Sequence, residues 1–302
     1  MDARTPDALI APEVAREWIA RWDAQQEGYL SSREERFSVI ADVVAAALDG
    51  RSSSPTIVDL GCGPGSLTAR LSERHPTATF IGIDADPVLL ELARAHYGTI
   101  ATWIEADLTT SGWVDALPAS IDAAVSTTAL HWLLPDQLAE LYRTIATRTR
   151  PGGIFVNGDH LGLADEHMAA LGAAVVDGRD ARADIGDREN WHDWWAAALS
   201  DERLSTLVAA RGNVAATEDH SGSTDERKHH SSQLSVTEHI TLLRSAGYTA
   251  AARSGRSGRT TSSPPCGDVS ADLWVISSVR PRQTPARADA DLGRHRGNRA
   301  RR

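Results

Sequence analysis

The stretch from residue 56 to residue 67, Thr-Ile-Val-Asp-Leu-Gly-Cys-Gly-Pro-Gly-Ser-Leu, constrains the possible fold more than any other part of the chain. Its first five residues favour a β-strand, and helix-forming residues follow after Ser66. Between them, glycine occupies alternate positions at 61, 63 and 65. Glycine tolerates a positive φ angle and lets a ligand approach the main chain, and the start of a helix offers unpaired N–H groups. The pattern therefore predicts a strand, a tight turn that holds a ligand, and a helix.

A carboxylate follows the next predicted strand. Residues 78–84 have the apolar pattern of a buried strand that ends in Asp84, which lies 19 residues beyond Gly65. One helix and one strand account for this distance, so a right-handed βαβ unit would place Asp84 beside the glycine turn. A carboxylate in that position can accept two hydrogen bonds from a ribose diol. Asp86 is better placed than Asp84 to cap the helix that we expect to begin at Pro87.

Strand and helix patterns alternate through the first half of the chain. Five strand-like segments are separated by helical patterns, and two helical patterns precede them in residues 10–48. This alternation predicts an α/β fold with a doubly wound, mostly parallel sheet, whose ligands lie beyond the carboxyl ends of the strands. Polar residues that directly follow the strands should then face one site; they are Asp59, Asp84, Asp107, Thr127, Thr128, His131, Asp159 and His160.

We expect the chain to have three parts. Residues 1–50 should form an N-terminal helical cap. Residues 51–280 should form one domain, in which the polar segments 211–233 and 253–269 are mobile loops. Residues 281–302 carry seven Arg and two Asp without apolar periodicity, which predicts a disordered basic tail.

Composition and charge argue against several classes of partner. The net charge of −10 repels phosphate backbones, so nucleic acid is not expected as a partner. Two cysteines, Cys62 and Cys266, cannot form a disulfide framework or a zinc site, and the pair His229 and His230 lacks converging ligands for a metal. No signal peptide or membrane span is recognisable, which predicts a cytoplasmic protein that makes no membrane contact.

Five motifs, in order and at suitable spacing, resemble those of class I S-adenosylmethionine-dependent methyltransferases. The fourth motif, Ser-Thr-Thr-Ala-Leu-His-Trp, is similar to that of the small-molecule branch that includes trans-aconitate methyltransferase. The resemblance covers residues 15–160 well and two later segments more loosely. It implies a Rossmann-like, seven-stranded sheet with N-terminal helices and a C-terminal antiparallel strand. The motifs are residues 58–65, 82–84, 105–108, 126–132 and 150–153, and the later segments are residues 234–248 and 272–279.

The resemblance implies an S-adenosyl-L-methionine site at the strand ends. Gly61 and Gly63 would contact the methionine part through their main chain, and Asp84 would bind the ribose hydroxyls. Asp107 would bind the adenine amino group, with Leu108 against the adenine face. The other positions implied in this site are Asp59, which would order the turn, Cys62, Gly65, Ala85, and Thr127, which stands where relatives often have Asn.

On the acceptor side, His131 and His160 are the catalytic candidates, because an imidazole can accept a proton at neutral pH. Tyr29, Trp132 and Trp194 are candidates for contacts with the substrate. Trp194 belongs to a run of three Trp in five residues, of which some could line an apolar pocket and others pack in the core. The implied reaction is methyl transfer to an oxygen, nitrogen or carboxylate of a small molecule; a carboxylate acceptor needs no base.

Two other functions remain open from the sequence. A nicotinamide-dependent oxidoreductase would share the fold, but Ser66 breaks the Gly-x-Gly-x-x-Gly pattern, and Lys228, the only lysine, is not preceded by the Tyr-x-x-x spacing of such enzymes. A non-catalytic, cofactor-binding module would keep the same site and methylate nothing. The sequence does not name the acceptor, and it is compatible with a monomer or a homodimer.

Overall fold

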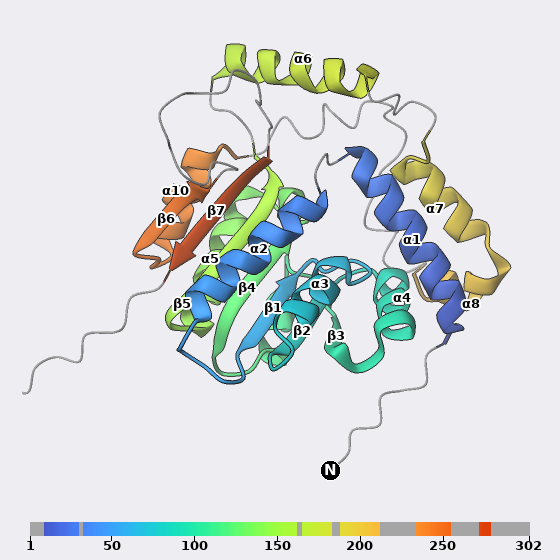
Figure 1. Cartoon of the computed structure of the whole chain (residues 1–302), viewed down its shortest axis with the longest axis horizontal. Coiled ribbons are helices and arrows are strands. Elements are labelled where there is room, and N and C mark those ends of the chain that lie inside the picture. The colour runs from blue at the N-terminus through green and yellow to red at the C-terminus, as the bar shows by residue number, and fades with distance from the viewer. Residues whose placement is uncertain are drawn as a thin grey trace, which may run out of the picture.

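The computed structural model describes residues 9–29, 33–161, 165–182, 188–211, 234–254 and 272–278. Within these residues, the strands form one sheet in the order β3-β2-β1-β4-β5-β7-β6 (Figure 1). Strands β1 to β5 run parallel to their neighbours among these five, and β7 runs antiparallel to both β5 and β6. The predicted α/β fold with a parallel sheet is therefore confirmed. The strands are β1 Thr56–Leu60, β2 Thr79–Asp84, β3 Ala101–Glu105, β4 Ile121–Thr127, β5 Thr149–His160, β6 Ala250–Ser254 and β7 Asp272–Ser278.

The winding of the chain reverses at the centre of the sheet, where β1 lies next to β4. From β1 the chain moves outward to β2 and β3, and after β4 it moves the other way to β5. Doubly wound sheets bind their ligands at such a switch point, beyond the carboxyl ends of the strands. The residues that follow β1 and β4 therefore lie where such folds bind their ligands.

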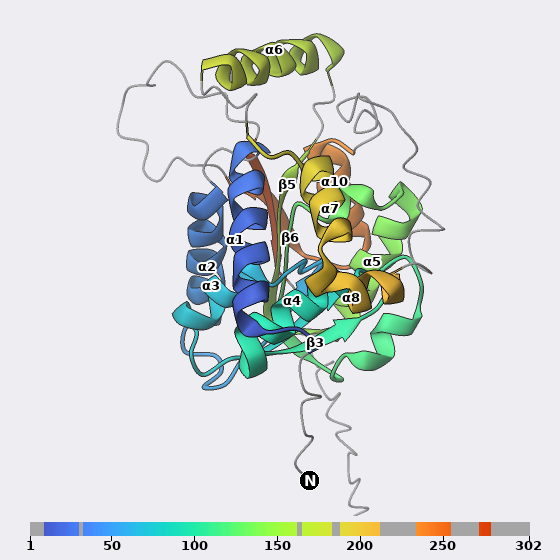
Figure 2. The ribbon, with the colours of Figure 1, turned by 90° about the vertical axis from the view of Figure 1, so that its right-hand side faces the viewer.

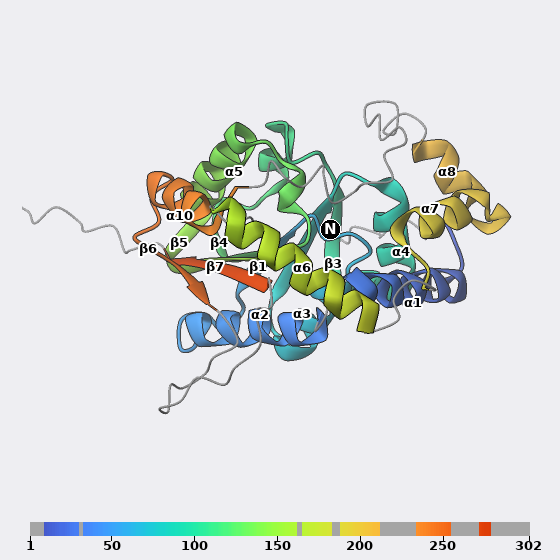
Figure 3. The same ribbon diagram turned by 90° about the horizontal axis from the view of Figure 1, so that it is seen from above.

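Helices cover both faces of the sheet (Figures 1 and 3). Helices α2 and α3 lie on one face, and α5 and α10 lie on the other. Strand β5 contributes to both layers, because Ile154 and Val156 pack on the α2 side while Phe155 packs on the α5 side. This burial on both faces explains why the parallel strands are apolar nearly throughout. The helices are α2 Arg33–Leu48, α3 Ser66–Arg74, α5 Pro135–Arg148 and α10 Val236–Ser245.

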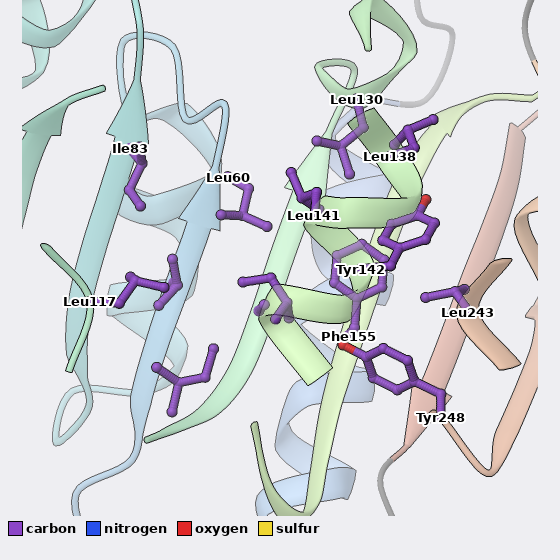
Figure 4. Close-up of a cluster of buried hydrophobic side chains, with 14 of the residues drawn as sticks. Leu60, Ile83, Leu117, Leu130, Leu138, Leu141, Tyr142, Phe155, Leu243 and Tyr248 are labelled. Carbon is purple, nitrogen blue, oxygen red and sulfur yellow. The ribbon is translucent and has the colours of Figure 1, made fainter. Parts of the chain in front are cut away.

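Figure 4 shows the core on the α5 side, in which Tyr142 lies close to Phe155. The rings of Tyr142 and Phe155 meet edge to face with centroids 5.2 Å apart. The Tyr142 hydroxyl lies 2.7 Å from Nδ1 of His239, so its polar tip has a partner although the side chain is fully buried. Leu130 is fully buried in the same core. This residue begins the short helix η3 (Leu130–Trp132), so the segment after β4 is anchored to the core.

Helix α1 (Pro12–Tyr29) packs against other helices and lies beside the sheet (Figure 2). Its partners are α4 (Pro87–Tyr97) and α7 (Trp191–Ser200), and α8 (Ser205–Arg211) belongs to the same hydrophobic cluster. The two helices predicted within residues 10–48 are confirmed as α1 and α2. Only α2 belongs to a layer that covers the sheet, whereas α1 packs against other helices.

The segment with three Trp in five residues does not form one continuous helix with the residues that follow it. Helix α7 ends at Ser200, and the short helix η5 (Glu202–Leu204) follows. The Asp201 carboxylate caps η5 by accepting a hydrogen bond from the main chain of Arg203. An Asp that caps a new turn competes with continuation of the helix. The segment therefore bends, and α8 packs against α4.

Helix α6 (Glu166–Arg182) lies above the carboxyl edge of the sheet, apart from the covering layers (Figures 1 and 2). Its apolar side chains Met168, Leu171 and Val175 are exposed. No helix was predicted for this segment.

Several predictions concern residues outside the described ones. They include most of the segments 211–233 and 253–269, all of residues 281–302, Cys266, and the pair His229 and His230. These remain predictions. A search of the helices in the described part of the chain finds none that is long and apolar enough to cross a membrane.

Candidate functional site at the carboxyl edge of the sheet

The glycine turn after β1 needs glycine for two physical reasons. Gly61, Gly63 and Gly65 have φ angles of +68°, +53° and +84°, a region that L-residues with a side chain rarely adopt. Space is also lacking, since a Cβ atom on Gly61 would lie 2.3 Å from the Cβ of Ala129, and one on Gly65 would lie 2.7 Å from the Trp103 ring. The turn is thus packed against the segment that follows β4 and against β3 itself.

The N–H groups of this turn are already used within the protein. Gly61 and Cys62 both donate to the carbonyl of Ile83, at 2.8 and 2.9 Å, and Gly65 donates to the carbonyl of Cys62 at 3.0 Å. The N–H of Gly63 donates to Oδ2 of Asp84 at 2.7 Å. A ligand at this turn would therefore meet carbonyl oxygens rather than the N–H groups of residues 61–65.

Asp84 links the end of β2 to the glycine turn. Besides its bond to Gly63, it accepts a hydrogen bond on Oδ1 from the main chain of Asp86 at 2.9 Å. Burial raises its pKa to about 6, against the lowering effect of these bonds. Each carboxylate oxygen can accept more than one hydrogen bond, so these contacts leave acceptor capacity for a ribose. The prediction that Asp86 caps the next helix is confirmed, because its side chain accepts from Val88 and Leu89.

Asp59 ties β1 to the helix that follows the turn. Its Oδ2 accepts a hydrogen bond from the Thr68 hydroxyl at 2.6 Å, and burial raises its pKa to about 7. Its Oδ1 is buried and has no hydrogen-bond partner among the described residues. The hydrogen bond from Thr68 fits the expected role of Asp59 in ordering the turn. The orphaned oxygen also indicates a site designed for a further donor, since buried polar atoms are normally paired.

The other implied cofactor positions lie around the ends of β2 and β3. Asp107 is exposed, and its Oδ1 accepts a hydrogen bond from the main chain of Thr109 at 2.8 Å. Leu108 is partly buried against the core on the α5 side, and Ala85 is partly buried beside Asp84. Cys62 is buried, and burial raises the pKa of its thiol well above the usual value, so it packs as a neutral side chain.

The segment after β4 is held by the end of β5. The Thr127 hydroxyl donates to the carbonyl of Gly158 at 3.0 Å, and the main chain of Thr128 donates to the same carbonyl at 3.1 Å. Thr128 has a φ angle of +50°, which is unusual for a β-branched residue. Such strained residues cluster at functional sites, where the surrounding structure holds them in place. Here the turn brings Ala129 onto Gly61.

His131 is paired with Asp159, which was noted as a strand-end residue but was not chosen as a site residue. The Nδ1 atom of His131 lies 2.8 Å from Oδ1 of Asp159, and the His131 main chain donates to Oδ2 at 3.1 Å. The Asp159 side chain has no exposed surface, and that of His131 is 11% exposed. Burial lowers the pKa of His131, but the carboxylate outweighs this effect and the pKa is raised. The adjacent, parallel ends of β4 and β5 were the signal for this pair.

Helix α1 contacts the same edge of the sheet through Asp23, a residue that sequence reasoning missed. Its Oδ1 accepts hydrogen bonds from the Ser66 hydroxyl at 2.6 Å and from Nη1 of Arg33 at 2.8 Å. Its Oδ2 pairs with Arg70 at 3.2 Å. Arg33 and Arg36 are both buried, and Arg36 donates to the carbonyl of Gly158 at 3.3 Å.

The structure corrects one predicted substrate contact. Trp194 is fully buried between helices, with its ring 5.3 Å from that of Trp18 and its Nε1 donating to the Trp18 carbonyl at 3.3 Å. It is a packing residue, because this contact leaves its ring no surface for a substrate. Trp132 is 56% exposed and stands beside His131. The side chains of Tyr29 and His160 lie outside the described part of the structure, so their predicted roles are untested.

Among the residues that the structure describes, no group of three or more His, Cys, Asp or Glu side chains is arranged to hold a metal ion.

The fold and the glycine turn define a class of protein, and the comparisons with known proteins agree with it. Residues 57–153 match the family model described as a methyltransferase domain. Over these residues, the chain is therefore similar to methyltransferase domains. Its sequence is 38% identical over 134 residues to trans-aconitate 2-methyltransferase of Azoarcus sp. (strain BH72), covering 44% of this chain and 48% of that protein.

A second relative has the same name, and a solved structure has a similar fold. The chain is 35% identical over 135 residues to trans-aconitate 2-methyltransferase of Streptomyces coelicolor, covering 44% of this chain and 43% of that protein. It thus spans about half the length of the curated relatives it matches. Among solved structures, the CurJ carbon methyltransferase superposes with a TM-score of 0.51 at 12% identity, covering 84% of this chain and 57% of that chain. This last likeness concerns the fold alone.

The residues of the site fit S-adenosylmethionine. All three glycines have a positive φ angle, and the absence of side chains at these positions allows close approach of a ligand to the main chain. The turn presents carbonyl oxygens, suited to an ammonium group, and Asp84 presents a carboxylate, suited to hydroxyl groups.

Proposed function

We propose that this protein is an S-adenosylmethionine-dependent methyltransferase that acts on an oxygen, nitrogen or carboxylate of a small molecule. The observation that carries the proposal is the glycine turn after β1, braced by Asp84 at the switch point of the sheet. The match of residues 57–153 to a methyltransferase domain supports it. So does the identity with proteins named trans-aconitate 2-methyltransferase, which also makes a small acceptor the preferred class.

The residues of the site would bind and orient the cofactor, which supplies an activated methyl group when bound. The carbonyl oxygens of Gly61 and Gly63 would accept hydrogen bonds from the amino group of its methionine part. Asp84 would accept the ribose hydroxyls, and Asp107 would accept the adenine amino group with Leu108 against the ring. Thr127 would act indirectly, because its hydroxyl already donates to Gly158 and holds the segment after β4. Alignment of reactants and exclusion of water can then supply most of the catalysis.

The wider predictions belong to the same proposal. The antiparallel pair β6 and β7 would complete a seven-stranded methyltransferase sheet, with residues 51–280 as the catalytic domain and residues 1–50 as its cap. The contacts of Asp23 on α1 with Ser66 and Arg33 support a capping role for that helix. The acidic net charge supports a small-molecule partner over nucleic acid. A monomer or a homodimer is equally compatible with the described contacts.

Calorimetric titration tests the proposal directly. Titration of the full chain with S-adenosylmethionine, S-adenosylhomocysteine and NAD should show binding of the first two only. A screen with radiolabelled methyl donor against small acids, phenols and amines should then transfer label to at least one class. Binding of NAD instead would favour the oxidoreductase. Binding of the methyl donor without transfer to any class would favour the non-catalytic module.

A further inference from the structure

The contact between His131 and Asp159 orients the imidazole at two points. The carboxylate accepts from the ring on one oxygen, at 2.8 Å, and from the main chain of the same residue on the other, at 3.1 Å. A ring held only through its side chain could rotate about the carboxylate. Because the same carboxylate also fixes the backbone of His131, the direction of the ring is determined by the end of β5.

The position of this pair relative to the glycine turn follows from Gly61. A Cβ atom there would lie 2.3 Å from the Cβ of Ala129, so the segment after β4 contacts the turn directly. His131 comes two residues later, between Leu130, which is buried in the core, and the exposed Trp132. The imidazole is therefore anchored next to the proposed cofactor site.

The surroundings of Asp159 keep its charge available to His131. Among the described residues, the titratable groups on the elements packed around it include Tyr142 on α5, His239 on α10 and Tyr248, which follows α10. The charged Arg36 of α2 lies close by and donates to the carbonyl of Gly158, the residue before Asp159. Burial raises the pKa of both tyrosines and lowers the pKa of His239, so all three are neutral at pH 7. Nearby Asn157 is fully buried, and neither its Oδ1 nor its Nδ2 has a hydrogen-bond partner among the described residues. The pair thus lies in a low-dielectric environment, where a carboxylate stabilises an imidazolium strongly.

We propose that the acceptor is a hydroxyl compound that must lose its proton, that His131 accepts this proton, and that Asp159 is the positioning residue for His131. This inference rests on the methyltransferase function proposed above. Asp159 engages Nδ1, so Nε2 is the nitrogen that acts on the acceptor. A carboxylate acceptor is ionised above about pH 5 and has no proton to give, so a buried and oriented imidazole would have no chemical role with it.

The reaction balances without any further reactant. The acceptor hydroxyl transfers its proton to Nε2 of His131 as its oxygen forms a bond to the methyl carbon. The bond between that carbon and sulfur breaks, and its electron pair stays on the sulfur, which becomes a neutral thioether. The positive charge of the sulfonium is thereby replaced by that of the imidazolium, which Asp159 stabilises. The proton then leaves to water.

A structural role predicts a different outcome. His131 and Asp159 join the segment after β4 to the end of β5, so the pair could serve only to fasten these two segments. In that case substitutions would lower thermal stability and cofactor affinity together. The rate of acceptor methylation would not depend on the protonation state of His131.

The first test does not need an acceptor. Long-range ¹H–¹⁵N spectra of the full chain should show His131 with its neutral-state proton on Nδ1, and its pKa should lie above about 6.5. Asp159→Asn should lower that pKa by about one unit or more, because it removes the opposite charge. His96 on α4 is the internal control, and its titration should not move. A His131 pKa that is unchanged in Asp159→Asn would overturn the positioning role.

The second test uses acceptors that carry both chemical groups. Hydroxybenzoates can be methylated on the hydroxyl, which gives an ether, or on the carboxylate, which gives an ester that mild alkali hydrolyses. A panel of hydroxybenzoates, phenols, and carboxylates including trans-aconitate should give alkali-stable product only. Esters as the only products, or no methylation of any hydroxyl compound by protein that binds the methyl donor, would overturn the proposal. Failure to bind the methyl donor at all would instead remove the proposed function.

Substitutions of His131 and Asp159 distinguish a catalytic role of the pair from a purely structural one. With an acceptor from the panel, His131→Ala should lower kcat by about 10²–10⁴-fold while affinity for S-adenosylhomocysteine stays within about threefold. The wild-type kcat should rise with pH to a plateau. Asp159→Asn should lower the plateau and move the inflection to lower pH, and Asp159→Glu should recover part of the rate. His96→Gln is the matched control. Equal losses of kcat and cofactor affinity in the His131 and Asp159 variants would show a structural role only.

Discussion

Gly61 and Gly50 have nearly the same backbone conformation, with φ angles of +68° and +66°, but different surroundings. A Cβ atom on Gly61 would lie 2.3 Å from Ala129, whereas one on Gly50 would meet nothing within 4 Å. The two positions therefore separate the cost of the left-handed conformation from the cost of a steric clash. The first cost is about 1–2 kcal/mol for a residue with a side chain, and overpacking adds roughly 1–3 kcal/mol.

We predict that Gly50→Ala lowers the free energy of unfolding by about 1 kcal/mol and leaves affinity for S-adenosylhomocysteine unchanged. Gly61→Ala should lower the free energy of unfolding further, by roughly 2–4 kcal/mol, and should reduce that affinity by about tenfold or more. Urea titration and calorimetry measure both quantities. Equal effects of the two substitutions would contradict the packing of the turn against Ala129.

Asp84 provides a pH-dependent prediction at the same scale. Its pKa is about 6 in the folded protein, above the 3.8 of an ordinary Asp. Its contribution to stability is therefore fully present below about pH 4 and is lost as the pH rises through 6. Cofactor binding has the opposite dependence, because the ionised carboxylate is the better acceptor for ribose hydroxyls.

Affinity for S-adenosylhomocysteine should accordingly fall as the pH is lowered from 7 to 5. Asp84→Asn should bind about 10- to 100-fold more weakly at pH 7 and should show a flatter pH dependence in this range. Asp115→Asn, on a different segment, is the control. If wild type and Asp84→Asn had parallel pH profiles, the assignment of Asp84 to the ribose would be wrong.

At the scale of elements, Asp23 joins α1 to α3 and to the start of α2. It accepts from Ser66 and Arg33 and pairs with Arg70, and its side chain is 23% exposed. Asp42 on α2 offers a comparison, because it also pairs with an Arg of α3, Arg74, but both side chains are more than half exposed. Exposed ion pairs contribute about 0–1 kcal/mol, and partly buried networks contribute more.

Asp23→Asn should therefore lower the free energy of unfolding by about 1–3 kcal/mol and should expose α1 to protease at lower enzyme concentrations. S-adenosylhomocysteine should protect α1 in the wild type and protect it less in the variant. Asp42→Asn should change stability by less than about 0.5 kcal/mol. Identical digestion of α1 with and without the ligand would argue against its role as a cap.

The elements differ in how far local sequence determines them. The strands, the glycine turn and the Asp86 cap follow from short-range patterns, and the structure has them in the predicted order. The hydrogen bond between His131 and Asp159 depends on the register of β4 against β5, which no local pattern encodes. Asp23 acts on Ser66, 43 residues away. Trp194 was misassigned because an aromatic residue on a helix has the same sequence pattern in a core and in a pocket.

The molecule as a whole should be stabilised by the ligand it binds. A ligand at 100 times its dissociation constant adds about 2.7 kcal/mol to the free energy of unfolding, which corresponds to a rise in Tm of roughly 5 °C for a domain of this size. S-adenosylhomocysteine should produce such a shift in a thermal denaturation scan, and NAD should not. Asp84→Ala should abolish the shift while retaining a cooperative transition. A shift with NAD alone would overturn the proposed cofactor.

The contact between Gly61 and Ala129 has a consequence for changing the acceptor by design. The segment after β4 carries His131 and the exposed Trp132, so it is an obvious region to exchange between related enzymes. Its Ala129, however, packs against the glycine turn, because a Cβ atom on Gly61 would lie 2.3 Å from the Cβ of Ala129. The two loops therefore cannot be swapped as independent modules. A transplanted acceptor loop should retain cofactor binding only if it preserves the contact of residue 129 with Gly61.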